Sequence, residues 1–161
     1  MTHTAKSRIY LAIIAVLILV IAGMAYQFII AGSTQKGEDG RRVAIVLAPA
    51  QRALMLREMR DFVAGLQLIS DGLSRDDMNA VAKAARAMGT ARAHDVPVAM
   101  MGKLPLEFKT LALGVHREFD TIAMDAEQMG MPKHTLGQLS ETLQRCVACH
   151  ATYEVKAAPA R

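Results

Sequence analysis

The sequence is poor in cysteine, and this shortage removes several classes of site. Its 161 residues contain two cysteines, Cys146 and Cys149. A second cysteine pair, which would complete a four-ligand zinc site at short spacing, is absent. A disulfide between residues three apart has poor geometry for stapling a fold. A thioredoxin-like redox pair follows a strand, and nothing strand-like precedes Cys146.

Charge of one sign is also scarce. The chain has 19 basic and 15 acidic residues. Lys6 and Arg8 precede an apolar N-terminal run, and without them 17 basic residues remain, so the rest of the chain has a net charge of +2. Such a balance favours neither nucleic acid nor a strongly charged partner surface. We therefore expect no nucleic-acid partner.

The two cysteines have a histidine beside them. In the segment CVACH, Cys146 and Cys149 lie three residues apart and His150 follows directly. Two thiols at this spacing can add across the two vinyl groups of one haem, and the adjacent histidine then reaches the iron. The motif predicts one covalently attached haem c, with thioether bonds from Cys146 and Cys149 and with His150 as the proximal axial ligand.

The longest apolar run lies at the other end of the chain. It reads IYLAIIAVLILVIAGMAYQFIIA, from Ile9 to Ala31, and contains no charged residue. As a helix this run spans roughly 34 Å, which is enough for the hydrocarbon core of a membrane. Residues 23–25 resemble a cleavage site, but the chain stays apolar beyond them. The run therefore favours an uncleaved anchor over a signal peptide.

These two ends predict the topology. Lys6 and Arg8 flank the start of the apolar run and favour a cytoplasmic N-terminus, while c-type haem is attached in the bacterial periplasm. We therefore expect a cytoplasmic segment at 1–8 and a single-pass inner-membrane anchor at 9–31. At 32–48 we expect a linker, flexible and glycine-rich over 32–42, followed by an entry segment into the domain. A periplasmic haem domain is expected at 49–161.

Strand-like alternation is scarce in the domain, where Ala, Leu, Met, Gln, Arg and Glu dominate. A first helix is predicted from Pro49, because apolar residues step by four and three through Met55, Met59, Phe62, Leu66, Ile69 and Leu73. Further helices are predicted over about 76–91, with Ser74 as N-cap, over 105–129, and from 136 to about 157. The last helix places on one inward stripe Leu139, Leu143, Cys146, His150 and Tyr153. The pattern predicts an all-α, antiparallel up-down four-helix bundle with the haem on its last helix.

These residues resemble the cytochrome c-prime family, the class II c-type cytochromes, over about residues 49–156. The matching segments are CVACHATY (146–153), HREFDTIAMDA in the third helix and MLREMRDF in the first. The anchor and the segment VAIVLAPA depart from the usual soluble family member. Glu154 also stands where the family often has arginine.

The resemblance implies that the first helix places one residue over the opposite face of the haem. A methionine there gives a six-coordinate haem suited to electron transfer, and an apolar residue gives a five-coordinate haem that binds NO or CO. Met59 is the candidate distal ligand, because its height along an antiparallel helix agrees with that of His150 to within roughly 5 Å. Met55 fits almost as well. Arg52 stands four residues before Leu56, a spacing that would place Leu56 over the iron.

The remaining histidines are weaker candidates for the second axial position. His94 and His134 are expected in loops. His116 is expected slightly off the seam of the third helix, as a surface or supporting group. The arginines that could pair with haem propionates are Arg52, Arg57 and Arg60.

We therefore expect a membrane-anchored monohaem c-type cytochrome that carries single electrons between redox partner proteins in the periplasm or inner membrane. Enzymatic turnover is not expected, because spacing alone places no acid–base pair near the motif. The alternative is a five-coordinate haem module that binds NO or CO in gas sensing or nitrosative-stress protection. Family members often form homodimers through helices one and two, so a homodimer is a further expectation.

Overall fold

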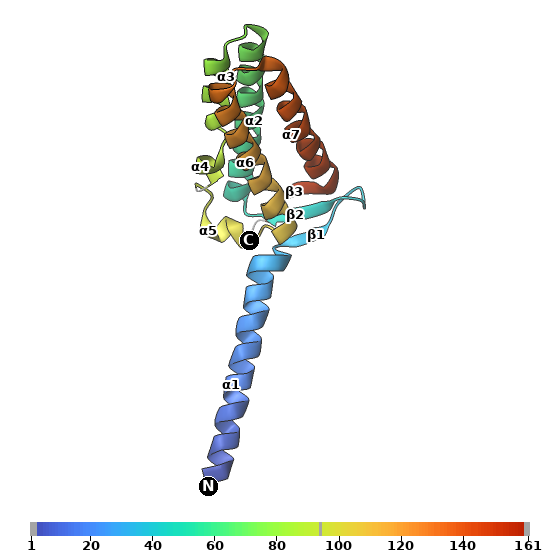
Figure 1. The fold of residues 1–161 in the computed structure, drawn as a ribbon. Coiled ribbons are helices and arrows are strands. Elements are labelled where there is room, and N and C mark those ends of the chain that lie inside the picture. Colours follow the sequence, from blue (N-terminus) through green and yellow to red (C-terminus); the bar gives the residue numbers. More distant parts are fainter. Residues whose placement is uncertain (1–2, 94, 160–161) are drawn as a thin grey trace.

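The computed structural model describes residues 3–93 and 95–159 and consists of a helical domain carried on one long helix (Figure 1). That helix, α1 (His3–Tyr26), continues into a π-helical turn, η1 (Gln27–Ala31). The domain comprises β1 (Thr34–Lys36), β2 (Val43–Leu47), α2 (Pro49–Ser74), α3 (Met78–Arg86), α4 (Thr90–Ala93), α5 (Val98–Met101), α6 (Leu106–Gln128), α7 (Pro132–Thr152) and β3 (Tyr153–Ala157). The prediction of a mostly helical chain with an apolar N-terminal helix is confirmed.

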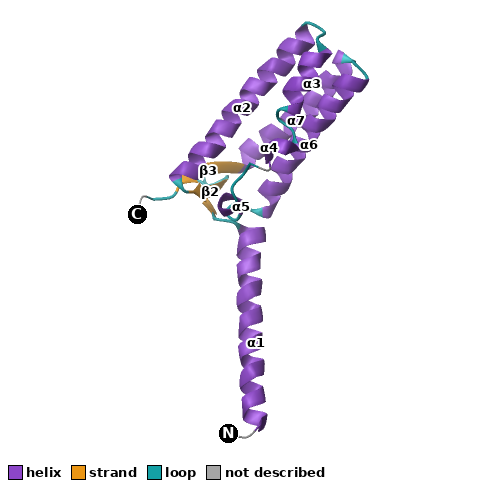
Figure 2. Cartoon of the chain, turned by 90° about the vertical axis from the view of Figure 1, so that its left-hand side faces the viewer, coloured by secondary structure: helices purple, strands orange, loops and turns teal. Residues whose placement is uncertain are grey.

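Three long helices, α2, α6 and α7, and the shorter α3 pack one against the next in chain order. α2 packs on α3, α3 on α6 and α6 on α7, whereas within the described chain α2 and α7 make no extensive contact (Figures 1 and 2). The shared core consists of Ile69, Val81, Ala82, Ala84, Ala85, Met88, Phe119, Ile122, Ala123, Ala126 and Leu139. Phe62, Leu66 and Leu73 of α2 pack against it, as their spacing predicts.

A three-stranded sheet lies at the end of the domain next to α1, so the all-α prediction is wrong (Figure 1). β2 is the central strand, antiparallel to β1 and parallel to β3, with Val43 opposite Tyr153 and Leu47 opposite Ala157. Two expectations are corrected by this sheet. Residues 32–42, expected as a flexible tether, contribute β1, and the entry segment to residue 48 contributes β2. The last helix ends at Thr152 rather than near Ala157.

Local chemistry accounts for the strands. β2 reads VAIVL, in which three of five residues are β-branched, and such residues favour strands over helices. Its Ile45 and Leu47 are fully buried. In β3, alternate residues Tyr153 and Val155 pack against the same apolar cluster as β2, as the two-residue period of a strand requires. Pairing with β2 thus ends the helix.

The second helix of the domain is shorter than expected. Ser74 is the last residue of α2 rather than the N-cap of the next helix, and α3 begins at Met78. The N-cap is Asp77, whose carboxylate accepts a hydrogen bond from the Ala80 amide at 3.0 Å. Asp and Ser are comparable N-cap residues. Asp76, with a φ of 54°, is not helical, so the new helix starts after this turn and Asp77 rather than Ser74 is its N-cap.

Close packing between α2 and the α3 region depends on glycine. A Cβ at Gly65 would lie 2.2 Å from the Met88 sulfur. We expect Gly65→Ala to lower the free energy of unfolding by about 1–3 kcal/mol, the usual cost of overpacking a core, as measured by chemical denaturation. Gly137→Ala is the matched control, because nothing lies within 4 Å of its added Cβ. It should gain about 0.5–1 kcal/mol from better helix propensity, and equal stability of the two variants would contradict this packing.

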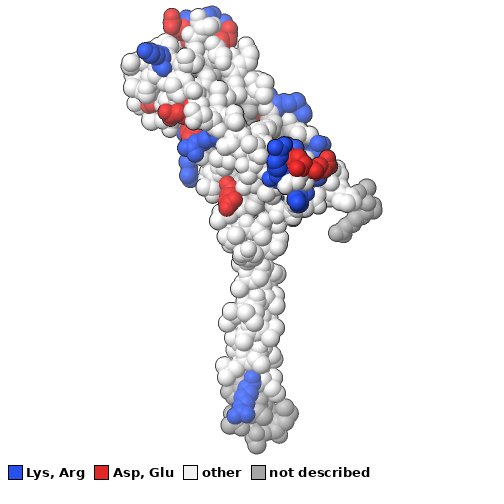
Figure 3. Space-filling view, turned by 90° about the vertical axis from the view of Figure 1, so that its right-hand side faces the viewer, with Lys and Arg blue, Asp and Glu red and all other residues white. Residues whose placement is uncertain are grey.

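α1 and η1 together form the one segment of the described chain that is long and apolar enough to cross a membrane. The span Arg8–Ala31 has a mean hydropathy of 2.7 and no buried residues. Figure 3 shows no charged side chains along this helix between its N-terminal end and the domain. Length and composition of this kind suit a membrane anchor and also a signal sequence.

Candidate cofactor site

The two cysteines and the adjacent histidine lie in the last two turns of α7. Cys146 and Cys149 are half-buried free thiols, and His150 is exposed, two residues before the helix ends at Thr152. The cysteines continue the buried stripe of α7, which consists of Thr135, Leu139 and Thr142. The expectation that His150 shares this inward stripe is wrong. At 3.6 residues per turn it lies on one flank of the helix.

That flank of α7 faces away from α6. Two ion pairs join α7 to α6, Arg145 with Glu118 and His134 with Asp125. Leu136 precedes Arg145 by nine residues, and Leu143 follows His134 by nine residues. Nine residues are two and a half turns of a helix, so both leucines lie on the side of α7 opposite these two ion pairs. His150 is about two turns from Leu143 and shares its side. An apolar flank that ends in a histidine is thus left uncovered by α6.

α2 presents a matching flank. Gly65 and Gly72 face the α3 region, because a Cβ at either position would meet Met88 or Val81. Leu56 and Val63 stand nine residues before these glycines, on the opposite side of the helix. An open cavity of about 620 Å³ follows this flank, lined by Leu56, Met59, Arg60, Val63, Ala64 and Gln67.

The sheet holds the two flanks apart. α7 ends just before Tyr153, which pairs with Val43, and α2 begins two residues after Leu47, at the other end of β2. Val43 and Leu47 are about 13 Å apart at the usual rise of a strand. Directly packed helices have their axes only about 8–10 Å apart. At this end of the domain, α2 and α7 are therefore too far apart for direct packing, in agreement with the lack of extensive contact between them in the described chain.

Cys149 and Met59 pack against one apolar cluster beside the sheet. The cluster consists of Ile45, Leu47, Met55, Met100, Leu104 and Phe108. Met55 is buried within it, at 7% exposed. Met59 packs against its edge and also lines the open cavity. Of the two methionines considered from the sequence, Met59 is the one that borders the open space, and Met55 fills the core.

Burial raises the pKa of both thiols, and the nearby Glu118 carboxylate also raises the pKa of Cys146. Both groups are therefore protonated at neutral pH. A zinc ligand or a redox nucleophile acts as the thiolate, so these surroundings favour neither. Among residues 3–93 and 95–159, no group of three or more His, Cys, Asp and Glu side chains is placed to hold a metal ion.

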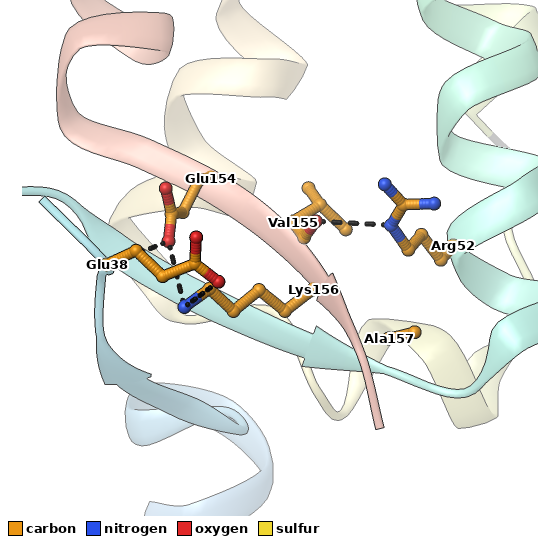
Figure 4. Close-up of a pocket in the computed structure, with 6 residues that line it drawn as sticks. All are labelled: Glu38, Arg52, Glu154, Val155, Lys156 and Ala157. Atoms are coloured by element: carbon orange, nitrogen blue, oxygen red, sulfur yellow. Dashed lines mark hydrogen bonds and ion pairs between the residues drawn. The ribbon is translucent and has the colours of Figure 1, made fainter. Parts of the chain in front are cut away.

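A second cavity, polar and of about 460 Å³, lies beside β3 and is lined by Glu38, Arg52, Glu154, Val155, Lys156 and Ala157 (Figure 4). Arg52 donates from Nε to the Val155 carbonyl at 3.2 Å. This bond positions the guanidinium, and among residues 3–93 and 95–159 no partner is found for its terminal amino groups, which suit an anion. Lys156, in contrast, is engaged by the carboxylates of Glu38 at 3.1 Å and Glu154 at 3.3 Å. Among the three arginines considered for propionates, Arg57 is exposed and Arg60 lines the apolar cavity.

Glu154 has a structural role that the sequence did not reveal. Its carboxylate accepts a hydrogen bond from the Glu38 amide at 3.1 Å and pairs with Arg42 at 2.7 Å. It therefore ties β3 to the turn between β1 and β2. The available signal was the pentapeptide VAIVL, whose β-branched residues indicate a strand that needs a partner.

The other histidines lie elsewhere. Of the two roles expected for His116, a surface group or a supporting group, its burial excludes the first. Its Nδ1 lies 2.7 Å from the Met88 carbonyl, and its ring lies 5.3 Å from that of Phe62. His134 is exposed in the first turn of α7, at the opposite end from the cysteines. His94 lies outside the described residues.

No family model, curated protein or solved structure gives a significant match to the chain. The function is therefore inferred from the residues and their arrangement.

Proposed function

We propose that the domain holds one haem c between α2 and α7 and that the protein carries single electrons at a membrane surface. The observation that carries this proposal is that α2 and α7 each present an apolar flank with a possible haem ligand. One is the apolar flank of α7 with the CxxCH motif at its end, and the other is the apolar flank of α2 with Met59. With the cofactor between them, α2, α3, α6 and α7 complete an up-down four-helix bundle.

The residues present fit such a group. The open hollow of about 620 Å³ follows the flank of α2, and all six residues that line it belong to that helix. Its lining is mainly apolar, with Arg60 among the lining residues. Arg52 lies beside β3, the strand that directly follows the motif, and its guanidinium is held there by the bond from Nε to the Val155 carbonyl. Bidentate arginine donors of this kind suit the propionates of a haem.

Each residue then has a distinct task. Cys146 and Cys149 anchor the group through thioether bonds, His150 provides the proximal axial nitrogen, and Met59 provides the distal sulfur. The haem iron supplies one-electron chemistry when bound. A methionine on the distal side leaves no free coordination position, so the partners are other redox proteins of the periplasm or inner membrane rather than a substrate.

A second function has its own supporting observation. Leu56 lines the same cavity as Met59, and Arg52 stands four residues before it. With Leu56 over the iron the haem would be five-coordinate and would bind NO or CO, in gas sensing or in protection against nitrosative stress.

One spectroscopic titration separates the two functions. The ferrous protein in detergent is exposed to CO while its visible spectrum is followed. For an electron carrier with Met59 on the iron we expect a low-spin spectrum that changes slowly or not at all. Immediate and complete conversion to a CO complex would exclude the carrier and support the gas-binding module.

The anchor is a separate proposal, made for the bacterial inner membrane with the domain in the periplasm. Because the span Arg8–Ala31 is strongly apolar and contains no buried residue, the full-length chain should stay in the membrane fraction after high-salt and carbonate washing. Mass spectrometry of the mature protein should find the N-terminal segment present. A mature N-terminus at Tyr26 would show instead that the segment is a cleaved signal.

A further inference from the structure

The end of α1 is locked to the domain at the level of the apolar span. The Ser33 amide donates to the Lys103 carbonyl at 2.7 Å. Lys109 Nζ donates to the carbonyls of Phe28 and Ile29 at 3.0 and 3.1 Å. Gly102 packs against the Phe28 ring so closely that a Cβ there would lie 2.2 Å from the ring.

These contacts place α5 at the depth of a membrane interface. Phe28 lies three residues inside the span Arg8–Ala31, which is about 4.5 Å along a helix. Gly102, which touches Phe28, is the residue directly after α5. Figures 1 and 2 agree in showing α5 and the start of α6 beside the end of α1.

The side chains exposed at this end are apolar. Val98 is 74% exposed, and its neighbours Pro97 and Ala99 are exposed as well. Leu106 in the first turn of α6 is 41% exposed. It stands three residues before Lys109 and so lies on the same face of α6 as the lysine that contacts Phe28. The residues from 96 to 106 include a lysine and no acidic residue.

We propose that Pro97–Leu106 forms a membrane-contacting patch, in which Val98 and Leu106 enter the boundary between headgroups and acyl chains beside α1. The occupant is the lipid bilayer, because the patch is continuous with the apolar span and fixed to it by Gly102 and Lys109. The proposal rests on α1 crossing a membrane and is independent of the haem. A second point of contact holds the domain in one orientation, with the sheet and the C-terminal end of α7 toward the membrane.

The chain contains no tryptophan, so single-tryptophan variants report lipid contact directly. The full-length protein carrying Val98→Trp is reconstituted into phosphatidylcholine–phosphatidylglycerol vesicles with and without bromine on the acyl chains. The brominated lipid should lower the emission by about twofold, because patch residues sit about 5–10 Å into the boundary. Leu106→Trp should respond in the same way. Comparison of the two lipids for each variant cancels any emission lost to haem.

Two control variants separate the patch from the anchor. Leu17→Trp lies within the span, and Leu68→Trp is an exposed site on α2, 53% exposed and about 28 Å beyond its start at Pro49. Quenching of Leu17→Trp and Val98→Trp, with none for Leu68→Trp, is the expected result. Quenching of Leu17→Trp alone would overturn the patch while leaving the anchor in place. No quenching at Leu17→Trp would overturn both. Iodide, which quenches tryptophan from the aqueous phase, gives a further test of Val98→Trp. If its emission is protected from iodide in native membranes but not in lipid vesicles, the patch contacts a protein partner and the proposal of lipid contact is wrong.

Discussion

A chain carrying Cys146→Ser and Cys149→Ser is expected to lose its covalent haem and several kcal/mol of stability. In the described chain the apolar flanks of α2 and α7 do not cover each other, because these two helices make no extensive contact. A large apolar ring between them would cover both flanks, and its removal leaves a cavity of the kind that costs about 3–5 kcal/mol. Acid–acetone extraction measures the attachment, and urea denaturation followed by circular dichroism measures the stability.

The control for this variant is Ala148→Ser. Ala148 is exposed and lies between the two cysteines, so an added hydroxyl there should change neither haem content nor stability. Non-extractable haem in the double-serine chain would show that the attachment is assigned to the wrong residues. Unchanged stability of the haem-free chain would show that the flanks are covered by something other than the cofactor.

Met59→Ala is expected to convert a low-spin haem into a largely high-spin one that binds CO readily. The substitution removes the thioether that occupies the distal position and opens a space beside the cavity. The visible and electron paramagnetic resonance spectra of the ferric protein report the spin state. The weak far-red band of sulfur-to-iron charge transfer should disappear at the same time, and the reduction potential should fall, since a methionine ligand raises the potential.

Met55→Ala is the matched control for this substitution. Met55 is 7% exposed and fills the apolar cluster beside the sheet. Its loss should cost about 2–5 kcal/mol of stability and leave the spectrum unchanged. A spectrum that changes with Met55→Ala and not with Met59→Ala would move the distal ligand to Met55. A wild-type protein that is already high-spin would favour Leu56 over the iron.

The sequence allowed the helices that bury a regular apolar stripe to be predicted, because such a stripe is a local property. α2 begins at Pro49 as expected, and its Phe62, Leu66 and Ile69 lie at the core. The last helix was also predictable, but its inward face only in part: Leu139 is buried and Cys146 half-buried as expected, whereas Leu143 and His150 are exposed.

The pairing of β2 with β3 was not predictable in the same way, because it joins residues more than a hundred positions apart. β2 pairs with β3, so the strand character of Tyr153–Ala157 depends on a partner at 43–47. A five-residue apolar run such as VAIVL is ambiguous by itself. The missed strand changed the reading of the site, because the height estimate for Met59 assumed a helix that runs to about Ala157. The choice of Met59 as distal ligand is now supported by a contact instead of that height estimate, because Met59 and Cys149 pack against the same apolar cluster.

The central claim is a haem bound covalently through Cys146 and Cys149, and the intact mass of the purified, denatured protein tests it most directly. The protein is expressed in a bacterium that attaches c-type haem in its periplasm, then extracted with acid–acetone before mass spectrometry. The expected mass is that of the chain plus one haem, and tryptic digestion should place the added mass on the peptide that contains CVACH. A chain of unmodified mass, or one with haem on any other peptide, would contradict the claim.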